Sequence, residues 1–349
     1  MAKNTYMKLL LVTQTIDRND PILGFFHAWV EEFARHTERV EVICLSEGVH
    51  RLPANVHVHS LGKEQHPPQL FRKFLFTLRF WQLVVRLRSN YDTVLVHMNP
   101  EYLLLGGVYW RLSQKKVGLW YVHKRVSWRL RAATMLANII FTASIESFRL
   151  VTPKVRVVGH GIDLSPWVNI RRTQSETLRL LTVGRIGGAK HIKEMLGVLE
   201  ALERRGVPAR LSIVGAGVTN VERQYEEEVR QAAARFGDAV QFAGPLPQEA
   251  VPAYLRDADV FLHLSTTGSL DKAVLEALIA GLPVVSNSEA FMDLLKPYGL
   301  FVSPVDSESL AERVRLAKNT DISVLAEKIK ATHALPTLIT RIVQEFSKP

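Results

Sequence analysis

The 349-residue sequence has a single cysteine and no long apolar run. Cys44 therefore cannot form an internal disulfide or a cysteine-based zinc site. The longest stretch without a charged side chain, residues 132–145, has 14 residues, and four of them carry a hydroxyl or amide group. This stretch is too short and too polar to cross a bilayer, which takes about 20 apolar residues. The apolar run 9–12 is too brief for the core of a signal peptide, so we expect a cytoplasmic protein.

The composition also excludes a disordered or fibrous protein. Hydrophobic residues make up 47% of the chain and charged residues 22%, with 20 glycines and 16 prolines spread along it. The length favours two domains. Strand-like apolar runs alternate with helix-length amphipathic segments, the pattern of parallel sheets with crossover helices. We therefore predict an α/β protein with two Rossmann-like domains facing each other across a cleft, because such sheets bind ligands beyond the carboxyl ends of their strands.

Apolar runs define the expected strands. In the first half these are residues 8–15, 40–45, 56–59, 93–97, 117–122, 139–142 and 155–158, and in the second half 178–183, 210–214, 240–242, 260–264, 283–286 and 300–302. Only helices are expected after the last of them. Residues 161–176 show no long apolar period and are predicted to link an N-terminal domain, 1–160, to a C-terminal domain, 177–332.

The net charge of +10 lies entirely in the first half of the chain. Residues 1–160 hold 22 basic and 11 acidic side chains, whereas the remainder has a net charge of −1. Most of the excess falls in residues 67–131, where 12 basic residues meet two acidic ones. Such a surface attracts an anionic partner, and nucleic acid, anionic lipid and a phosphorylated substrate all fit this charge.

A glycine-rich turn follows the predicted strand 178–183. It reads GRIGGAK over residues 184–190 and leads into a helix that begins near His191. The start of a helix presents free backbone N–H groups, and Arg185 and Lys190 add two cations beside them, which suits a diphosphate. The alternative is that both cations are solvated loop charges.

A second polar loop leads into a helix after the predicted strand 260–264. Ser269 is the expected N-cap of this helix and Gly281 its C-terminal glycine. Lys272 and Glu276 lie one turn apart on it, among apolar neighbours. The pair fits either a helix-surface ion pair or a carboxylate that binds the hydroxyl groups of a ligand, and the spacing leaves both open.

Together with segments 159–163 (GHGID) and 211–217 (LSIVGAG), these two motifs resemble glycosyltransferase family 4, within the glycosyl transferases group 1. The resemblance covers nearly the whole chain. It implies the GT-B fold and the transfer of a sugar, with retention of anomeric configuration, from a nucleoside-diphosphate donor to an acceptor hydroxyl. By the same resemblance, Arg185 and Lys190 would hold the donor diphosphate and Glu276 would bind the ribose hydroxyls. The terminal helix, 333–349, would cross back to the N-terminal domain.

One position departs from the family pattern. Relatives carry a second glutamate eight positions before the ribose-binding one, where it contacts the donor sugar, and this chain has Gly268 there. Asp271 and Lys272 lie nearby and are the expected replacements. Because of this departure, a non-catalytic nucleotide-sugar-binding protein is the alternative function. The resemblance implies a donor-binding set of Gly24, Gly184, Gly215, Gly268, Ser269, Asp271, Lys272 and Glu276.

Two residues of the first half match family positions more loosely. Gly24 follows the first predicted strand, where relatives place a glycine loop near the donor phosphate, and its alternative role is to begin a helix. His123 follows the predicted strand 117–122, where relatives keep a histidine that faces the donor sugar. With Arg185 and Lys190 it completes the expected catalytic set. Its alternative role is that of an ordinary hydrogen-bonded surface group.

No metal and no cofactor besides the donor substrate are expected. Asp257 and Asp259 spell the Asp-x-Asp signature with which other glycosyltransferases bind a metal, but they precede a strand, whereas ligand sites in such sheets follow one. A retaining hydrolase needs two carboxylates that face each other across the sugar, and none are evident. The resemblance implies front-face transfer, in which a donor phosphate oxygen takes the acceptor proton. The two cations of the glycine-rich turn and the helix N-terminus would stabilise the departing diphosphate.

The basic region indicates where an acceptor would be presented. Arg72, Arg79 and Arg86 recur every seven positions in segment 69–88 and fall on one helical face, beside several aromatic residues. This is the arrangement of a helix that lies at a membrane surface. The alternative is a domain helix with a broad core face and a narrow wet stripe.

A further basic cluster includes Lys124 and Arg125 and is interleaved with tryptophans, which favours an anionic lipid surface. We therefore expect a glycan or lipid-linked acceptor. The protein would lie in the cytoplasm, either free or bound peripherally to the inner face of the cell membrane. Nucleic acid is not expected as a partner, because no recognition helix, zinc finger or RNA-recognition signature is present.

Overall fold

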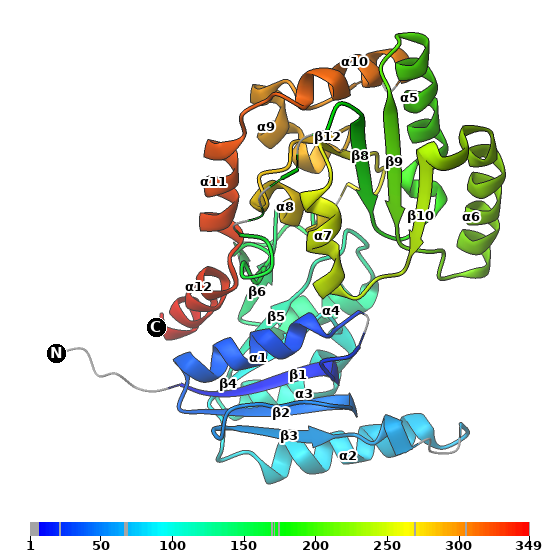
Figure 1. Cartoon of the computed structure of the whole chain (residues 1–349). Coiled ribbons are helices and arrows are strands. Elements are labelled where there is room, and N and C mark those ends of the chain that lie inside the picture. Colours follow the sequence, from blue (N-terminus) through cyan, green and yellow to red (C-terminus); the bar gives the residue numbers. More distant parts are fainter. Residues whose placement is uncertain are drawn as a thin grey trace. The chain divides into compact units, whose positions relative to one another are not determined.

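A computed structural model describes residues 7–20, 22–65, 69–168, 170, 172–173, 175–268, 270–303 and 306–348 (Figure 1). The chain forms two compact units. Unit 1 comprises Met1–Asp163 and Thr332–Pro349, and unit 2 comprises Leu164–Ala331. Each unit contains one parallel β-sheet with helices packed on it, which confirms the predicted α/β class with two Rossmann-like domains. The cleft between the domains stays a prediction.

Unit 1 is built on a seven-stranded sheet in the order β3-β2-β1-β4-β5-β6-β7. Its strands are β1 (Lys8–Ile16), β2 (Arg39–Glu47), β3 (Val56–Ser60), β4 (Thr93–His97), β5 (Lys116–Trp120), β6 (Ile139–Thr142) and β7 (Val155–Val157). All seven predicted strands of this half are therefore present. The prediction is wrong in detail at β5, which ends at Trp120, two residues earlier than expected.

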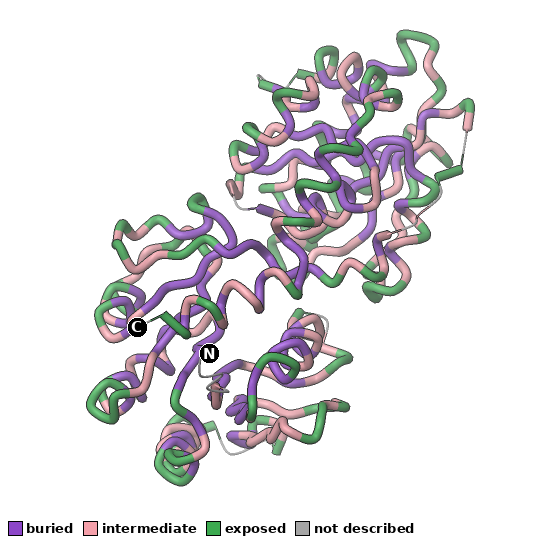
Figure 2. The backbone as a smooth tube through the Cα atoms, turned by 90° about the vertical axis from the view of Figure 1, so that its left-hand side faces the viewer, coloured by how far each residue is buried: buried purple, intermediate pink, exposed green. Residues whose placement is uncertain are grey.

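Different helices cover the two faces of this sheet. Successive side chains of β1 alternate between the faces, so Leu9 and Leu11 pack in one core while Leu10 and Val12 pack in the other. Helices α1 and α12 cover the first face, and α2, α3 and α4 cover the second. Figure 2 shows buried segments that run through the interior of each unit and exposed segments at its outside. The helices are α1 (Phe25–His36), α2 (Arg72–Arg86), α3 (Pro100–Leu112), α4 (Trp128–Leu136) and α12 (Leu335–Ser347).

The last helix of the chain packs into unit 1. Leu338, Ile342 and Phe346 of α12 are buried there. The ring of Phe346 meets that of Phe141 edge to face, with centroids 5.2 Å apart. A Cβ at Gly118 would lie 2.6 Å from the Phe346 ring, so only glycine leaves room for it. Residues from both ends of the chain therefore form one core.

Unit 2 is built on a five-stranded sheet in the order β10-β9-β8-β11-β12. Its strands are β8 (Leu178–Val183), β9 (Ala209–Val214), β10 (Val240–Gly244), β11 (Val260–His263) and β12 (Val284–Ser286). The later helices are α5 (Ile192–Arg204), α6 (Asn220–Ala233), α7 (Val251–Arg256), α8 (Lys272–Ile279), α9 (Met292–Leu295), α10 (Ser307–Ala317) and α11 (Ser323–His333). The predicted strand 300–302 is wrong. Only Phe301 pairs, as an isolated bridge to Ser286, because β12 ends there.

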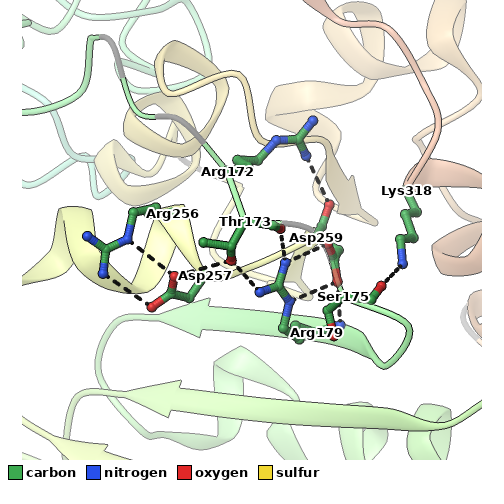
Figure 3. Close-up of polar contacts among 8 residues, drawn as sticks. All are labelled: Arg172, Thr173, Ser175, Arg179, Arg256, Asp257, Asp259 and Lys318. Atoms are coloured by element: carbon green, nitrogen blue, oxygen red, sulfur yellow. Dashed lines mark hydrogen bonds and ion pairs between the residues drawn. The ribbon is translucent and has the colours of Figure 1, made fainter.

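The segment predicted as a linker, 161–176, is largely packed onto unit 2, to which residues from Leu164 onward belong. Trp167 is fully buried. Arg179 at the start of β8 binds the Asp259 carboxylate through Nε and Nη2, at 3.1 and 3.0 Å, and also donates to Thr173 (Figure 3). Lys318 of the stretch after α10 donates to the Ser175 carbonyl at 2.8 Å. The sequence indicated a linker because the partners of this segment are remote in the sequence, and its composition gives no sign of them.

Candidate functional site

The polar loops of unit 2 follow the carboxyl ends of its strands, at the edge of the sheet where ligands bind in such folds. The turn 184–190 follows β8, Gly215 follows β9, and the loop 264–271 follows β11. The backbone N–H of Thr266 donates to the Ala189 carbonyl at 3.2 Å, which ties the first and last of these loops together. The structure thus brings most of the predicted donor-site residues of this half to one edge.

Two glycines let the first loops pack closely. The Gly184 N–H donates to the Val214 carbonyl at 2.9 Å, and the Ile186 N–H to the Ala216 carbonyl at 3.1 Å. Gly215 has a φ of +131°, and a Cβ there would lie 1.9 Å from the Gly184 carbonyl oxygen. Any side chain at Gly215 would therefore separate the two loops.

Lys190 ends the turn and forms an ion pair with Asp271, the residue that precedes α8. Both side chains are partly buried. Burial raises the pKa of Asp271, but the hydrogen bond with His263 and the charge of Lys190 outweigh this and lower it well below its ordinary value. Asp271 is therefore ionised at neutral pH and can only accept hydrogen bonds.

Arg185, the other predicted cation, lies in solvent. Its side chain is 70% exposed, and its Nη1 is 3.6 Å from Oε1 of Glu222. Glu222 also forms a capping box with Thr219 at the start of α6. A pair this exposed contributes little to stability, so Arg185 is able to turn toward a ligand.

The start of α5 differs from the free helix N-terminus that the sequence predicted. The N–H groups of Ile192 and Lys193 donate to the hydroxyl of Tyr225, at 3.1 and 3.4 Å. His191, the N-cap, has a left-handed backbone and donates its N–H to the Gly188 carbonyl. Because a tyrosine from α6 occupies these donors, the positive charge at this edge comes mainly from Lys190 and Arg185.

Helix α8 carries the second predicted motif. Its N-cap is Asp271, so the prediction of Ser269 as N-cap is wrong, and Ser269 itself lies outside the described residues. Burial raises the pKa of Glu276 and lowers that of Lys272, and each shift is opposed by the charge of the other residue. Gln248 Nε2 lies 3.5 Å from Oε1 of Glu276. A carboxylate in such apolar surroundings gains from hydrogen-bond donors, as ribose hydroxyls would be.

The position where relatives carry a second glutamate has a backbone conformation that suits glycine. Gly268 has a φ of +61°, in the left-handed region. The nearby polar groups belong to the loop itself, where the Ser265 and Thr267 hydroxyls lie 2.9 Å apart. The carboxylate nearest in sequence is Asp271, as expected for a replacement.

The sequence prediction missed His263, the last residue of β11. It is 3% exposed. Its Nε2 lies 2.7 Å from the same Asp271 oxygen that binds Lys190, and its Nδ1 lies 2.9 Å from the Ser286 hydroxyl. Burial lowers the pKa of His263, against the opposing effect of Asp271. A histidine within an otherwise apolar strand was the available signal.

The candidate residues of unit 1 lie apart from one another in the sequence and play local structural roles. Gly24 is the N-cap of α1, and a Cβ there would lie 2.7 Å from the Asp20 carbonyl, so this tight turn requires glycine. His123 lies three residues beyond β5 and is exposed, and its Nδ1 accepts the Arg125 N–H at 3.0 Å. These contacts fit the alternative roles, and the roles of both residues in donor binding stay predictions.

Helix α2 shows an unexpected distribution of its side chains. Phe80 and Val84 are buried against the sheet, but the opposite side exposes Phe74 by 67%, together with Leu78 and Val85. As in the alternative, α2 is a domain helix that packs on its own sheet, but its core face is narrow rather than broad. Apolar side chains of α3 are exposed as well, and Trp81 of α2 meets Tyr109 of α3 edge to face. We define the α2–α3 apolar face as Phe71, Phe74, Leu78, Val85, Val108 and Leu112.

The three arginines of α2 differ from the prediction in one respect. Arg72 and Arg86 are exposed, and they are the sequence neighbours of Phe71 and Val85 in the α2–α3 apolar face. Arg79 is instead turned onto its own unit, where its Nη1 donates to the Leu61 carbonyl at 2.9 Å and to Gln65 at 3.3 Å. Its assignment to a free surface is corrected accordingly. Of the second cluster, Arg125 is exposed and Lys124 is half-buried.

Asp257 and Asp259 are engaged in contacts that do not form a metal site. Asp259 binds Arg179, and Asp257 binds Arg256 and Thr173 (Figure 3). Both precede β11, at the edge of the sheet opposite the loops described above. Within the described part of the chain, no three His, Cys, Asp or Glu residues are grouped as a metal ion would need.

Comparison with known proteins agrees with this arrangement. Residues 167–332 match the model of the family described as Glycosyl transferases group 1. The match covers nearly all of unit 2 and just under half of the chain. Its glycine-rich turn and helix α8 lie inside the matched segment, whereas most of unit 1 lies outside it. The predicted relationship is thereby confirmed at the level of the group.

The names of the curated relatives refer to glycan biosynthesis or to sugar transfer. Over 203 residues, the chain is 30% identical to the GDP-mannose:cellobiosyl-diphosphopolyprenol alpha-mannosyltransferase of Xanthomonas oryzae pv. oryzae, a match that covers 54% of this chain and 51% of the relative. Over 144 residues, it is 29% identical to the amylovoran biosynthesis glycosyltransferase AmsK of Erwinia amylovora, covering 39% and 34%. The chain spans about half the length, or less, of the curated relatives that it matches first.

The solved structures show the fold. HepE of Anabaena, in complex with UDP and glucose, superposes with a TM-score of 0.73 at 18% identity, covering 99% of this chain and 100% of that one. This similarity and the family match confirm the GT-B fold.

Proposed function

We propose that this protein is a retaining glycosyltransferase that moves a sugar from a nucleoside-diphosphate donor to an acceptor hydroxyl. The observation that carries the proposal is the meeting of the two predicted motifs at one sheet edge, through the ion pair of Lys190 with Asp271. Unit 2 matches a glycosyltransferase family over nearly its whole length, and HepE was solved with UDP and glucose bound. A non-catalytic nucleotide-sugar-binding protein is the second candidate, because Gly268 stands where relatives have a carboxylate.

The chemistry follows from where the charges lie. Lys190 and Arg185 would bind the donor diphosphate and stabilise the negative charge that develops on it as it leaves. Glu276 would accept hydrogen bonds from the ribose hydroxyls. Asp271, which is held ionised, would accept a hydrogen bond from a hydroxyl of the donor sugar and so replace the missing glutamate.

Proton transfer would use the donor itself. Asp271 and Glu276 belong to one helix, Asp271 as its N-cap and Glu276 near its middle, so they are not placed as the facing pair that a retaining glycosidase uses. A donor phosphate oxygen would therefore take the proton of the acceptor hydroxyl on the face from which the diphosphate departs. The proposal involves no metal and no cofactor besides the donor substrate.

We propose further that the acceptor is a lipid-linked or membrane-presented glycan and that unit 1 binds the cytoplasmic face of the membrane. The α2–α3 apolar face is exposed and has Arg72 and Arg86 as sequence neighbours, in a unit with a large positive charge. Apolar side chains beside cations match the interface of an anionic bilayer. The Xanthomonas relative is named for a diphosphopolyprenol acceptor. No described helix is both long enough and apolar enough to span a bilayer.

The test is a binding screen of nucleotide sugars by calorimetry, followed by a transfer assay with membrane extract and the donor that binds. An enzyme would release the nucleoside diphosphate and label a lipid-extractable or membrane-bound product. Tight binding without hydrolysis or transfer would favour the binding protein instead. If no nucleotide sugar bound, both candidate functions would be wrong.

A further inference from the structure

We propose that His263 is a positioning residue for the donor site and acts through Asp271 on Lys190. The inference rests on the proposed function, since it concerns how Lys190 is prepared for a diphosphate. It goes beyond it by assigning a role to a buried side chain that contacts no part of the expected donor. The observation is a continuous hydrogen-bond chain from β12 through β11 to the glycine-rich turn.

The chain has a defined direction. The Ser288 N–H donates to the Ser286 hydroxyl oxygen at 3.1 Å, and the hydroxyl can then donate its own hydrogen to Nδ1 of His263, 2.9 Å away. Nε2 of His263 faces a carboxylate at 2.7 Å and therefore carries the proton. A neutral imidazole with its hydrogen on Nε2 satisfies every contact in this chain, and burial favours the neutral form.

The side chain of Asp271 makes these contacts instead of capping its own helix. An aspartate at an N-cap ordinarily accepts a hydrogen bond from the first turn of its own helix. Asp271 is the N-cap of α8, but its side chain makes no such bond. One of its oxygens is instead shared between His263 and Lys190. The carboxylate of Asp271 therefore orients Lys190 rather than capping α8.

Sharing this oxygen has two effects on Lys190. The hydrogen bond from His263 fixes the rotamer of Asp271, and with it the place of the Lys190 ammonium group. It also withdraws negative charge from the oxygen that Lys190 contacts, which leaves more of the positive charge of Lys190 for a diphosphate. Loss of the imidazole would therefore weaken anion binding on both counts.

The contacts run from Ser286 through His263 to Asp271, in the order of a hydrolase triad. They cannot form a catalytic triad, however. Ser286 is fully buried, and its hydroxyl is held by Ser288 and His263. A nucleophile must reach the substrate, so a positioning role remains for His263.

The experiment compares full-length variants by calorimetry with three probes: UDP, GDP and inorganic pyrophosphate. His263→Leu should weaken binding of the diphosphate that the parent binds by about fivefold or more. His263→Gln keeps an N–H donor toward Asp271 and should restore most of that affinity. Phe291→Leu is the matched control. Phe291 is buried and lies edge to face against His263 at 5.7 Å, so this variant disturbs packing without removing a hydrogen bond of the chain.

A double-mutant cycle separates positioning from a general loss of structure. If His263 acts through Lys190, then His263→Leu combined with Lys190→Ala should bind no more weakly than Lys190→Ala alone. Parent-like affinity of His263→Leu, additive losses in the cycle, or an equal loss in Phe291→Leu would each overturn the inference and leave the proposed function standing. If the parent bound none of the three probes, the proposed function would fail as well.

Discussion

The two units have similar parallel sheets, but they differ in net charge and in how their candidate residues contact one another. Unit 2 is nearly neutral, and Lys190, Asp271 and His263 contact one another at the carboxyl ends of its strands. Unit 1 carries the excess positive charge on its outer surface, beside the α2–α3 apolar face. A site for a defined small ligand needs fixed contacts, whereas attraction to a charged surface needs only net charge.

The largest expected effect is on the stability of unit 1, and it tests whether the two units unfold independently. Leu338 of α12 is fully buried in unit 1, so Leu338→Ala should lower the free energy of unfolding of that unit by about 2–5 kcal/mol. Five of the six tryptophans precede residue 163, so tryptophan fluorescence during thermal unfolding reports mainly on unit 1. Nucleoside-diphosphate affinity at low temperature should be unchanged. The control is Leu316→Ala, at an exposed position of α10. If Leu338→Ala also weakened nucleoside-diphosphate binding at low temperature, the two units would be coupled.

The next effect concerns the charge of the donor site. Lys190→Ala should weaken binding of the nucleoside diphosphate at least tenfold, since a hydrogen bond to a charged group contributes about 1.5–3 kcal/mol. Arg185→Ala should have a smaller effect, because its side chain starts in solvent. Lys193→Ala is the matched control, because Lys193 lies three residues later, in the first turn of α5, and pairs with Glu228 instead. Calorimetry that gave Lys190→Ala and Lys193→Ala the same affinity would exclude Lys190 from the site.

A pH titration tests Glu276. If the ionised carboxylate accepts ribose hydroxyls, nucleotide affinity should fall as the pH falls through its folded-state pKa. Because burial raises the pKa of Glu276, this fall should begin at a higher pH than an ordinary glutamate would give. Glu276→Gln should bind more weakly at neutral pH and lack this titration. Lys272→Met should shift the fall to still higher pH, because the Lys272 charge opposes the rise in pKa. The same pH profile in Glu276→Gln and the parent would contradict the ribose assignment.

The smallest effect for a single residue is expected at the surface of unit 1. Each basic residue near an anionic bilayer contributes about 1 kcal/mol, so Arg72→Gln combined with Arg86→Gln should weaken co-sedimentation with phosphatidylglycerol vesicles at low salt. Nucleotide binding should not change. Arg35→Gln is the control, because Arg35 is exposed on α1, which covers the other face of the sheet. Replacement of Phe74 and Leu78 by serine should weaken binding at both low and high salt, since apolar contacts are not screened. No preference of the parent for anionic over neutral vesicles would refute the membrane proposal.

The fold was largely predictable from the sequence because most of its strands are buried strands of parallel sheets. Residues 8–15 read as one apolar run because successive side chains of β1 enter two different cores. The glycine-rich turn and helix α8 were recognisable because their residues are close in sequence and follow strands. Segment 300–302 is equally apolar, but only Phe301 pairs with another strand, through an isolated bridge to Ser286.

The contacts that complete the site depended on tertiary structure. Lys190 and Asp271 are separated by 81 positions in the sequence, and His263 and Ser286 by 23, so no local pattern predicts either pair. The N-cap of α8 is Asp271 rather than Ser269, and Tyr225 of α6 occupies the N–H groups at the start of α5. The sequence by itself determined the strands, the basic charge of the first half and the residue types at the donor edge. Only the folded chain decided which of those residues meet, because hydrogen bonds and ion pairs depend on distances that the fold sets between elements remote in the sequence.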